Sequence, residues 1–268
     1  MKKRAITAFF FVAVMLASLL LGAYAFTIFF LLLSLFSTEE FYKLVRTDGL
    51  KPRSVLGWLL VISIYLPLSL CYLNGASPLI LFICVPFFIT IIIAELYRDL
   101  EKPFHHIAYT IFGVLFSALP FCFFYALGFI EGEYSWHLPL AFLIMLWAND
   151  TGAYLFGITL GKNRLFERHS PKKSWEGFFG GLLCSLISGF ILSTYFNNLS
   201  IFHWLMVSII IVVSGTLGDL SESMLKRSLS TKDSGSFLPG HGGLLDRFDG
   251  LLLAAPLVFV YLTLLKIS

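Results

Sequence analysis

The feature that most constrains this chain is a succession of apolar runs, each long enough to cross a lipid bilayer. Residues 5–36 are uninterruptedly apolar, and further runs of about 20 residues follow as far as Leu265. Only 13% of the 268 residues are charged, whereas soluble domains carry about 25%. The sequence therefore predicts an all-α polytopic membrane protein.

The first apolar run is too long for one helix, because its residues would extend about 48 Å against a hydrocarbon core of about 30 Å. Gly22 offers a turn inside this run, so we expect two short helices there. The other spans are expected at residues 54–73, 76–94, 107–130, 138–160, 177–196, from about 201, and 251–265, which gives about nine transmembrane helices. The start of the chain imitates a cleavable signal peptide, but a second apolar run follows at once. We therefore expect an uncleaved first helix.

The distribution of positive charge predicts the orientation. With nine spans and a cytoplasmic N-terminus, 18 of the 19 Lys and Arg residues fall on the cytoplasmic side. Merging the first two spans would instead place the basic cluster at residues 2–4 opposite the other basic loops. We expect an integral protein of a bacterial inner (plasma) membrane, with its active site facing the cytoplasm, where nucleotides are found.

Two regions are expected along the chain. Residues 1–130 form the N-terminal transmembrane helices, with about five spans. Residues 131–268 form a C-terminal catalytic region that contains a polar segment, residues 214–250. The four cysteines lie far apart inside apolar runs, which argues against a zinc site or disulfides.

The polar segment combines two kinds of charged side chain. Its acids are Asp219, Glu222, Asp233, Asp246 and Asp249, and its bases are Lys226, Arg227, Lys232 and Arg247. Carboxylates bind hard cations such as Mg²⁺, and Lys and Arg bind phosphate oxygens. The segment therefore predicts a metal–phosphate site. If the eighth span continues as a helix past Gly218, then Asp219, Glu222, Ser223 and Lys226 share one face; the alternative is a solvated face with a Glu222–Lys226 pair.

The run from Pro239 to Gly243 is conformationally permissive, and its glycines allow close backbone approach and anion binding by N–H groups. A plain turn is the alternative. Asp246, Arg247 and Asp249 follow directly, where the chain re-enters the bilayer. Charged side chains at that depth are energetically costly, which indicates a functional role.

Asn149 and Asp150 lie near the middle of the sixth span. A carboxylate there indicates a functional site, or else a structural polar bond between helices. The next loop carries Lys172 and Lys173, which at the least set the topology. This loop is no P-loop, because the spacing is one residue short and no strand precedes it. Gly157, Gly161, Gly177 and Gly181 are typical of close helix packing.

Three stretches of the polar segment carry a resemblance to a known family. They are SMLKR at residues 223–227, KDSG at residues 232–235 and LPGHGGLLDRFD at residues 238–249, a pattern of 27 residues without a departure. They resemble the signature of the phosphatidate cytidylyltransferases, also called CDP-diacylglycerol synthases. Asn149, Asp150 and residues 170–177 also resemble that family, whereas the first five spans match it only in general character.

The resemblance implies that CTP and phosphatidate react to CDP-diacylglycerol and pyrophosphate with Mg²⁺. It implies Asp219 and Asp246 as metal ligands, followed by Asp249 and Glu222. Phosphate contacts are expected from Lys226, Arg227, Lys232, Arg247, Lys172 and Lys173, and further substrate contacts from Ser223, His241, Gly242, Gly243 and Asn149. Asp150 would complete the metal site or orient a cationic group. The partners implied are CTP, phosphatidate and the bilayer, without nucleic acid; a homodimer is compatible with the sequence.

Rival functions come from two classes. A CTP-dependent polyprenol or dolichol kinase would transfer the γ-phosphate to an alcohol and release CDP. A membrane transporter could use Asp150 and the acidic cluster as an ion path, although no inverted repeat is evident. Enzymes that consume CDP-lipids are disfavoured, because their paired-aspartate motif does not follow Asp249-Gly250.

Overall fold

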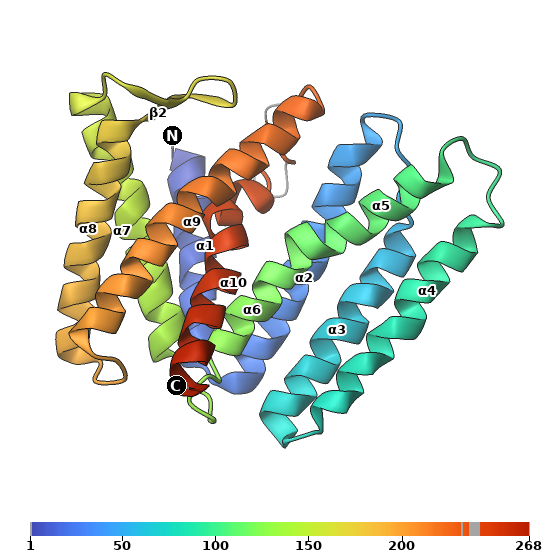
Figure 1. Cartoon of the computed structure of the whole chain (residues 1–268), viewed down its shortest axis with the longest axis horizontal. Coiled ribbons are helices and arrows are strands. Elements are labelled where there is room, and N and C mark those ends of the chain that lie inside the picture. Colours follow the sequence, from blue (N-terminus) through green and yellow to red (C-terminus); the bar gives the residue numbers. More distant parts are fainter. Residues whose placement is uncertain (1, 232, 236–241, 268) are drawn as a thin grey trace. The chain divides into compact units, whose positions relative to one another are not determined.

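The computed structural model describes residues 2–231, 233–235 and 242–267 of this chain (Figure 1). The chain forms two compact units that are described one at a time. The first unit comprises Met1–Tyr134 and Leu229–Arg247, and the second comprises Ser135–Ser228 and Phe248–Ser268. The functional division at residue 130 stays a prediction.

The first unit is built from helices. They are α1 (Lys2–Leu20), α2 (Ala23–Arg46), α3 (Ser54–Asn74), the 3₁₀ helix η1 (Pro78–Ile83), α4 (Cys84–Glu95), α5 (Pro103–Gly113), the π-helical turn η2 (Val114–Ala118) and α6 (Leu119–Leu127). Figure 1 shows α3 and α4 running side by side. Gly22 separates α1 from α2 with a φ of 101°, in the left-handed region that favours glycine. The predicted break at Gly22 is confirmed.

Aromatic side chains fill the core of the first unit. Phe26 and Phe30 of α2 pack against Phe124 and Tyr125 of α6, and all four are fully buried. Farther along α2, the Tyr42 hydroxyl donates to the carbonyl of Thr110, with an O–O distance of 2.6 Å. Helix α2 reaches Arg46, so it extends ten residues past Phe36, where the apolar run of the sequence ends. The acids and bases at the end of α2 therefore lie on a helix.

The second unit consists of four helices and one small hairpin. Its elements are α7 (His137–Leu160), β1 (Arg164–Phe166), β2 (Ser170–Ser174), α8 (Trp175–Tyr195), α9 (Ile201–Ser228) and most of α10 (Leu245–Ile267). The two strands pair antiparallel within what was predicted as a basic loop. Helix α9 continues past Gly218 as expected. Helix α10 begins at Leu245 rather than Leu251, because its first N–H groups find acceptors described below.

Glycines bring α7 and α8 close together. A side chain at Gly177 would lie 2.8 Å from the Ala153 carbonyl oxygen, and one at Gly181 would overlap Asn149. On α7, a side chain at Gly152 would lie 2.7 Å from the Gly180 carbonyl oxygen. The packing role predicted for Gly177 and Gly181 is confirmed.

Seven helical segments among the described residues are long and apolar enough to cross a membrane. They are Ser54–Asn74, Pro78–Glu95, Pro103–Leu127, His137–Leu160, Trp175–Tyr195, Ile201–Ser228 and Leu245–Lys266. A shorter apolar stretch, Phe9–Leu20, lies in α1. The helical membrane fold is confirmed, while the count of nine spans and the cytoplasmic N-terminus stay predictions.

We expect Gly152→Ala to lower the stability of the protein by about 1–3 kcal/mol, because the added methyl group forces α7 and α8 apart. Gly157→Ala, on the same helix, is the matched control, since its nearest neighbour would be 3.7 Å away, an ordinary contact. Apparent melting temperatures in detergent would compare the two variants. Equal melting temperatures would contradict the packing described here.

Candidate functional site

A polar cavity of about 330 Å³ lies inside the second unit. Its charged and amide side chains come from four elements: α7, β2, α9 and α10. They are Asn149, Asp150, Lys172, Lys173, Asp219 and Asp249. Six of the predicted site residues, from three separate parts of the sequence, therefore line one cavity.

Helix α7 contributes an amide and a carboxylate at adjacent positions. Asn149 is buried, and its Nδ2 lies 3.4 Å from Oδ1 of Asp150. Room for the Asn149 side chain exists only because residue 181 of α8 is glycine. The close packing of α7 and α8 thus also shapes the cavity wall.

The hairpin holds the two lysines in place. Glu176 accepts from the backbone N–H groups of Lys162 and Asn163 at 3.2 Å, and the Asn163 side-chain amide donates to it at 2.7 Å. Ser174 caps α8 by accepting from the N–H of Gly177 at 3.1 Å. These bonds tie both ends of the hairpin to the first turn of α8. Lys172 and Lys173 on β2 therefore lie at the cavity.

Lys173 forms an ion pair across the cavity wall. Its Nζ lies 2.5 Å from Oδ2 of Asp219 on α9. Close contact between α9 and α10 brings Asp219 and Asp249 to the same cavity, because a side chain at Gly218 would overlap the Asp249 carbonyl oxygen. Oδ1 of Asp249 accepts from the N–H of Gly250 at 2.7 Å. Glycine at position 218 is thus a condition for this arrangement of carboxylates.

The other predicted residues of α9 are placed differently. Ser223 donates to Oδ1 of Asp219 at 3.3 Å, so it supports the cavity carboxylate. Glu222 is 1% exposed and pairs with Lys226 at 2.5 Å, the i, i+4 pair that was the simpler interpretation of this face. Neither Glu222 nor Lys226 lines the polar cavity. Arg227 is exposed at the end of α9.

The described part of the glycine-rich signature belongs to the first unit. Oδ2 of Asp246 accepts from the N–H groups of Ser234 at 3.0 Å and of Gly243 at 2.9 Å. Gly242 has a φ of 79°, in the left-handed region that a glycine adopts readily. Arg247 is exposed in the first turn of α10. Lys232 and His241 lie outside the described residues.

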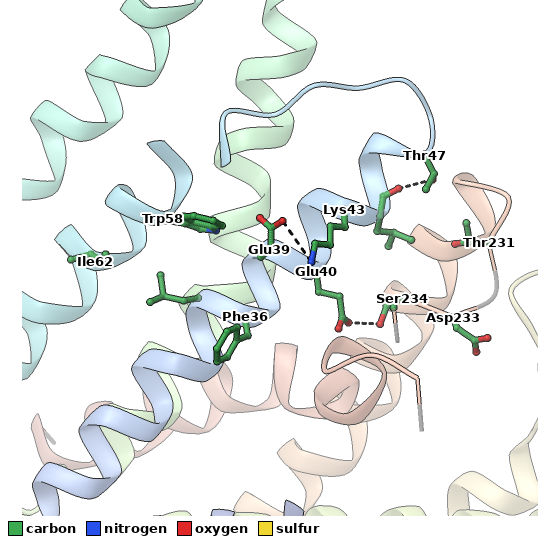
Figure 2. Close-up of a pocket in the computed structure, with 13 residues that line it drawn as sticks. Phe36, Glu39, Glu40, Lys43, Thr47, Trp58, Ile62, Thr231, Asp233 and Ser234 are labelled. Carbon is green, nitrogen blue, oxygen red and sulfur yellow. Dashed lines mark hydrogen bonds and ion pairs between the residues drawn. The ribbon is translucent and has the colours of Figure 1, made fainter. Parts of the chain in front are cut away.

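Sequence analysis missed one residue that holds this segment in place. It is Glu40, which lies on α2. Both of its carboxylate oxygens are used: Oε2 accepts from the N–H of Leu244 at 2.8 Å, and Oε1 accepts from that of Leu245 at 2.9 Å. The Ser234 hydroxyl also donates to Glu40, as Figure 2 shows. Glu40 is only 6% exposed. The N–H groups at a helix start have no intrahelical acceptor, so this distant carboxylate serves as the cap of α10.

A signal for Glu40 was present in the sequence. Two acids, Glu39 and Glu40, lie shortly after the end of a long apolar run, and the sequence analysis gave them no role. The partner of Glu40, 204 residues away, could not be identified from the local pattern.

The cavity of the second unit suits a cation and phosphate oxygens together. Among the described residues, no group of three or more His, Cys, Asp or Glu side chains forms a complete metal site. Mg²⁺ does not require one, because it is usually held by one or two carboxylates together with water and substrate phosphates. One or two of the cavity carboxylates, such as Asp219 and Asp249, therefore suffice for Mg²⁺, and Lys172 and Lys173 supply positive charge for phosphate.

Comparison with known proteins gives a consistent result. The cytidylyltransferase family model matches residues 2–265 of the chain. A phosphatidate cytidylyltransferase of Staphylococcus haemolyticus is 36% identical over 266 residues, which cover 98% of this chain and 99% of that protein. Proteins of the same name from Staphylococcus epidermidis and Staphylococcus aureus are 35% identical, with the same coverage.

We expect Glu40→Ala to destabilise the protein by several kcal/mol, because buried N–H groups left without an acceptor cost about 1–3 kcal/mol each. Glu40→Gln should have a smaller effect, since one side-chain oxygen remains as an acceptor. Limited proteolysis of residues 229–247 and melting temperatures would measure both. Glu133→Gln, at an exposed loop position, is the control; an equal response of all three variants would refute the capping role.

Proposed function

Since this chain belongs to the cytidylyltransferase family, we infer that it transfers CMP from CTP to phosphatidate, giving CDP-diacylglycerol and pyrophosphate. Relatives of that name match it over nearly their whole length. The observation in the chain itself that best supports this function is the polar cavity, where three carboxylates and two lysines come together within a membrane-embedded unit. The protein is thus an integral membrane nucleotidyltransferase of phospholipid biosynthesis.

The reaction is a substitution at phosphorus. A phosphate oxygen of phosphatidate attacks the α-phosphorus of CTP and forms a new P–O bond. The bond between the α-phosphorus and the bridging oxygen breaks, and pyrophosphate leaves with that electron pair. The attacking phosphate is already ionised, so positioning and neutralisation of charge are the main requirements on the protein. No general base is needed.

The geometry supports a division of roles in the cavity. Lys172 and Lys173 bind phosphate oxygens, and Lys173 can exchange part of its contact with Asp219 for the substrate. Asp219 and Asp249 would hold Mg²⁺, which would neutralise charge on the triphosphate. Asp150, oriented by Asn149, contributes a third carboxylate to the same cavity. Ser223 keeps Asp219 in place.

The predicted residues that do not line the polar cavity also belong to the proposal. Asp246, the other expected metal ligand, has Oδ2 engaged by two backbone N–H groups. One carboxylate oxygen with two lone pairs can accept both, so Asp246 holds the loop that carries Ser234 and Gly243 and is proposed as a metal ligand at the start of α10. Basic side chains are proposed for the triphosphate and the lipid phosphate: Lys226, Arg227, Lys232 and Arg247. Glu222 is the least favoured ligand because it pairs with Lys226.

Two finer points also belong to the proposal. The site would face the cytoplasm, as the distribution of Lys and Arg predicts, and the chain would form a homodimer. Labelling of single introduced cysteines in intact cells would test the first point, and light scattering of the protein in detergent would test the second.

The first experiment is to incubate the purified protein with phosphatidate, Mg²⁺ and CTP labelled at the α-phosphate. We expect the label to enter the lipid phase as CDP-diacylglycerol, with one pyrophosphate released for each turnover, and to stop entering when Mg²⁺ is chelated. Release of CDP together with a phosphorylated lipid alcohol would instead support the kinase alternative. A folded protein that consumes neither substrate would reopen the transporter alternative.

Substitutions in the cavity test the assigned roles. We expect Lys173→Ala and Asp219→Asn to lower kcat/KM by about 100-fold or more, as the loss of a group that stabilises transition-state charge does. Asp219→Asn should also raise the Mg²⁺ concentration needed for half-maximal rate, because a ligand is weakened. Lys162→Ala, at an exposed position two residues before the hairpin, is the control.

If Lys173→Ala and Lys162→Ala lose activity equally while both remain folded, then the lysines act only through general positive charge. If Asp219→Asn keeps the Mg²⁺ dependence of the original protein, then Asp219 is not a metal ligand.

A further inference from the structure

A second and larger cavity lies entirely within the first unit. Its volume is about 800 Å³, in the usual range for small-molecule sites. Its walls come from α2, from α3, and from Thr231 and residues 233–235, as Figure 2 shows. None of the residues that line it belongs to the polar cavity of the second unit. It is therefore a separate candidate site.

One part of this cavity is apolar and another part is polar. Leu35, Phe36 and Ile62 form apolar wall, whereas Glu39, Lys43 and Ser234 line the polar part (Figure 2). This combination suits a ligand with a hydrocarbon chain and a polar end.

Two buried polar atoms on the wall have no hydrogen-bond partner within the described protein. They are Nε1 of Trp58, which can only donate, and Oε2 of Glu39, which can only accept while ionised. Buried polar atoms are nearly always satisfied, because leaving one unpaired is costly. A hydroxyl group can accept from the first and donate to the second. Both side chains line the same cavity (Figure 2).

The charges on the wall disfavour an anionic ligand. Among the described residues, Glu39, Glu40 and Asp233 line the cavity together with Lys43. Glu39 lies 3.9 Å from Lys43 and 3.5 Å from Arg46, which does not line the cavity, and Glu40 is bonded to the start of α10. A phosphate group here would meet net negative charge at short range, where electrostatic repulsion is strong. An uncharged polar end fits better.

We propose that this cavity binds an uncharged long-chain amphiphile with a hydroxyl-bearing polar end, of the acylglycerol class. Its chain lies along the apolar wall of α2 and α3, and a hydroxyl group bridges Trp58 and Glu39. The ligand also touches Ser234, whose backbone N–H holds Asp246. Binding would therefore stabilise the segment that carries Asp246. The first unit would in this way respond to an acylglycerol that is not phosphatidate, the substrate.

The test uses the full chain reconstituted in nanodiscs of phosphatidylcholine, a lipid without free hydroxyl groups. A monoacylglycerol with a photoreactive group on its chain is added at a low mole fraction, irradiated, and mapped by peptide mass spectrometry. We expect labelling on α2 and α3 at the cavity. Unlabelled monoacylglycerol should compete for the site, whereas phosphatidate at the same mole fraction should not.

Two variants probe the site directly. Trp58→Phe keeps a ring but removes the N–H donor, so labelling should fall about 3- to 10-fold, the value of one hydrogen bond. Ile62→Trp should abolish labelling by filling the cavity. Trp175→Phe, on α8 of the other unit, is the matched control and should label like the original protein.

Several outcomes would overturn the proposal. Labelling no higher than that of the lipid-facing surface means that the cavity holds no such ligand. Equal competition by phosphatidate means that charge does not select the occupant. Unchanged labelling of a folded Trp58→Phe variant would show that no hydroxyl group of the ligand bridges Trp58 and Glu39. Because the competition experiment uses the unaltered protein, the proposal stays testable even if a variant does not fold.

Discussion

The hydrogen bonds between Glu40 and the start of α10 are the interaction on which most of this structure depends. They join α2, near the beginning of the chain, to the segment that carries the signature residues. The first N–H groups of a helix have no acceptor within the helix, so burying them without other acceptors would strongly destabilise the fold. A carboxylate supplies those acceptors and also favours the positive end of the helix dipole. Asp246, one residue into the helix, is then free to hold the preceding loop through Ser234 and Gly243.

Glycine has two distinct roles around these sites. At Gly218 and Gly181 it lets helices approach until a backbone or amide oxygen occupies the place of a side chain, and that approach brings the cavity carboxylates together. Gly243, in contrast, leaves room for Glu40 and Ser234, because a side chain there would overlap both. The glycines of the signature therefore serve contacts within the protein as much as turn geometry. Sequence alone suggested close approach, but not which group would approach.

Much of the architecture could be predicted because apolar run length and helix breaks are local properties. The break at Gly22 and the extent of α7 and α8 followed from them. Residues 164–174 were harder, since a short hairpin of exposed polar residues has no apolar periodicity. The predicted site residues of α7, β2, α9 and α10 meet in one cavity, but the pairing of Lys173 with Asp219 depends on how the hairpin is fixed by Glu176. Glu40 could not be predicted, because its partners are distant in sequence.

The long separation between Glu40 and its partners also bears on the order in which the protein is made. Glu40 is synthesised with α2, whereas Leu244 and Leu245 follow about 200 residues later, at the start of α10. During synthesis, the carboxylate must therefore stay in contact with water or with temporary partners while the intervening helices enter the membrane. The first unit reaches its final form only when the start of α10 returns to α2. The segment that carries Asp246 is thus fixed only after α10 has been synthesised.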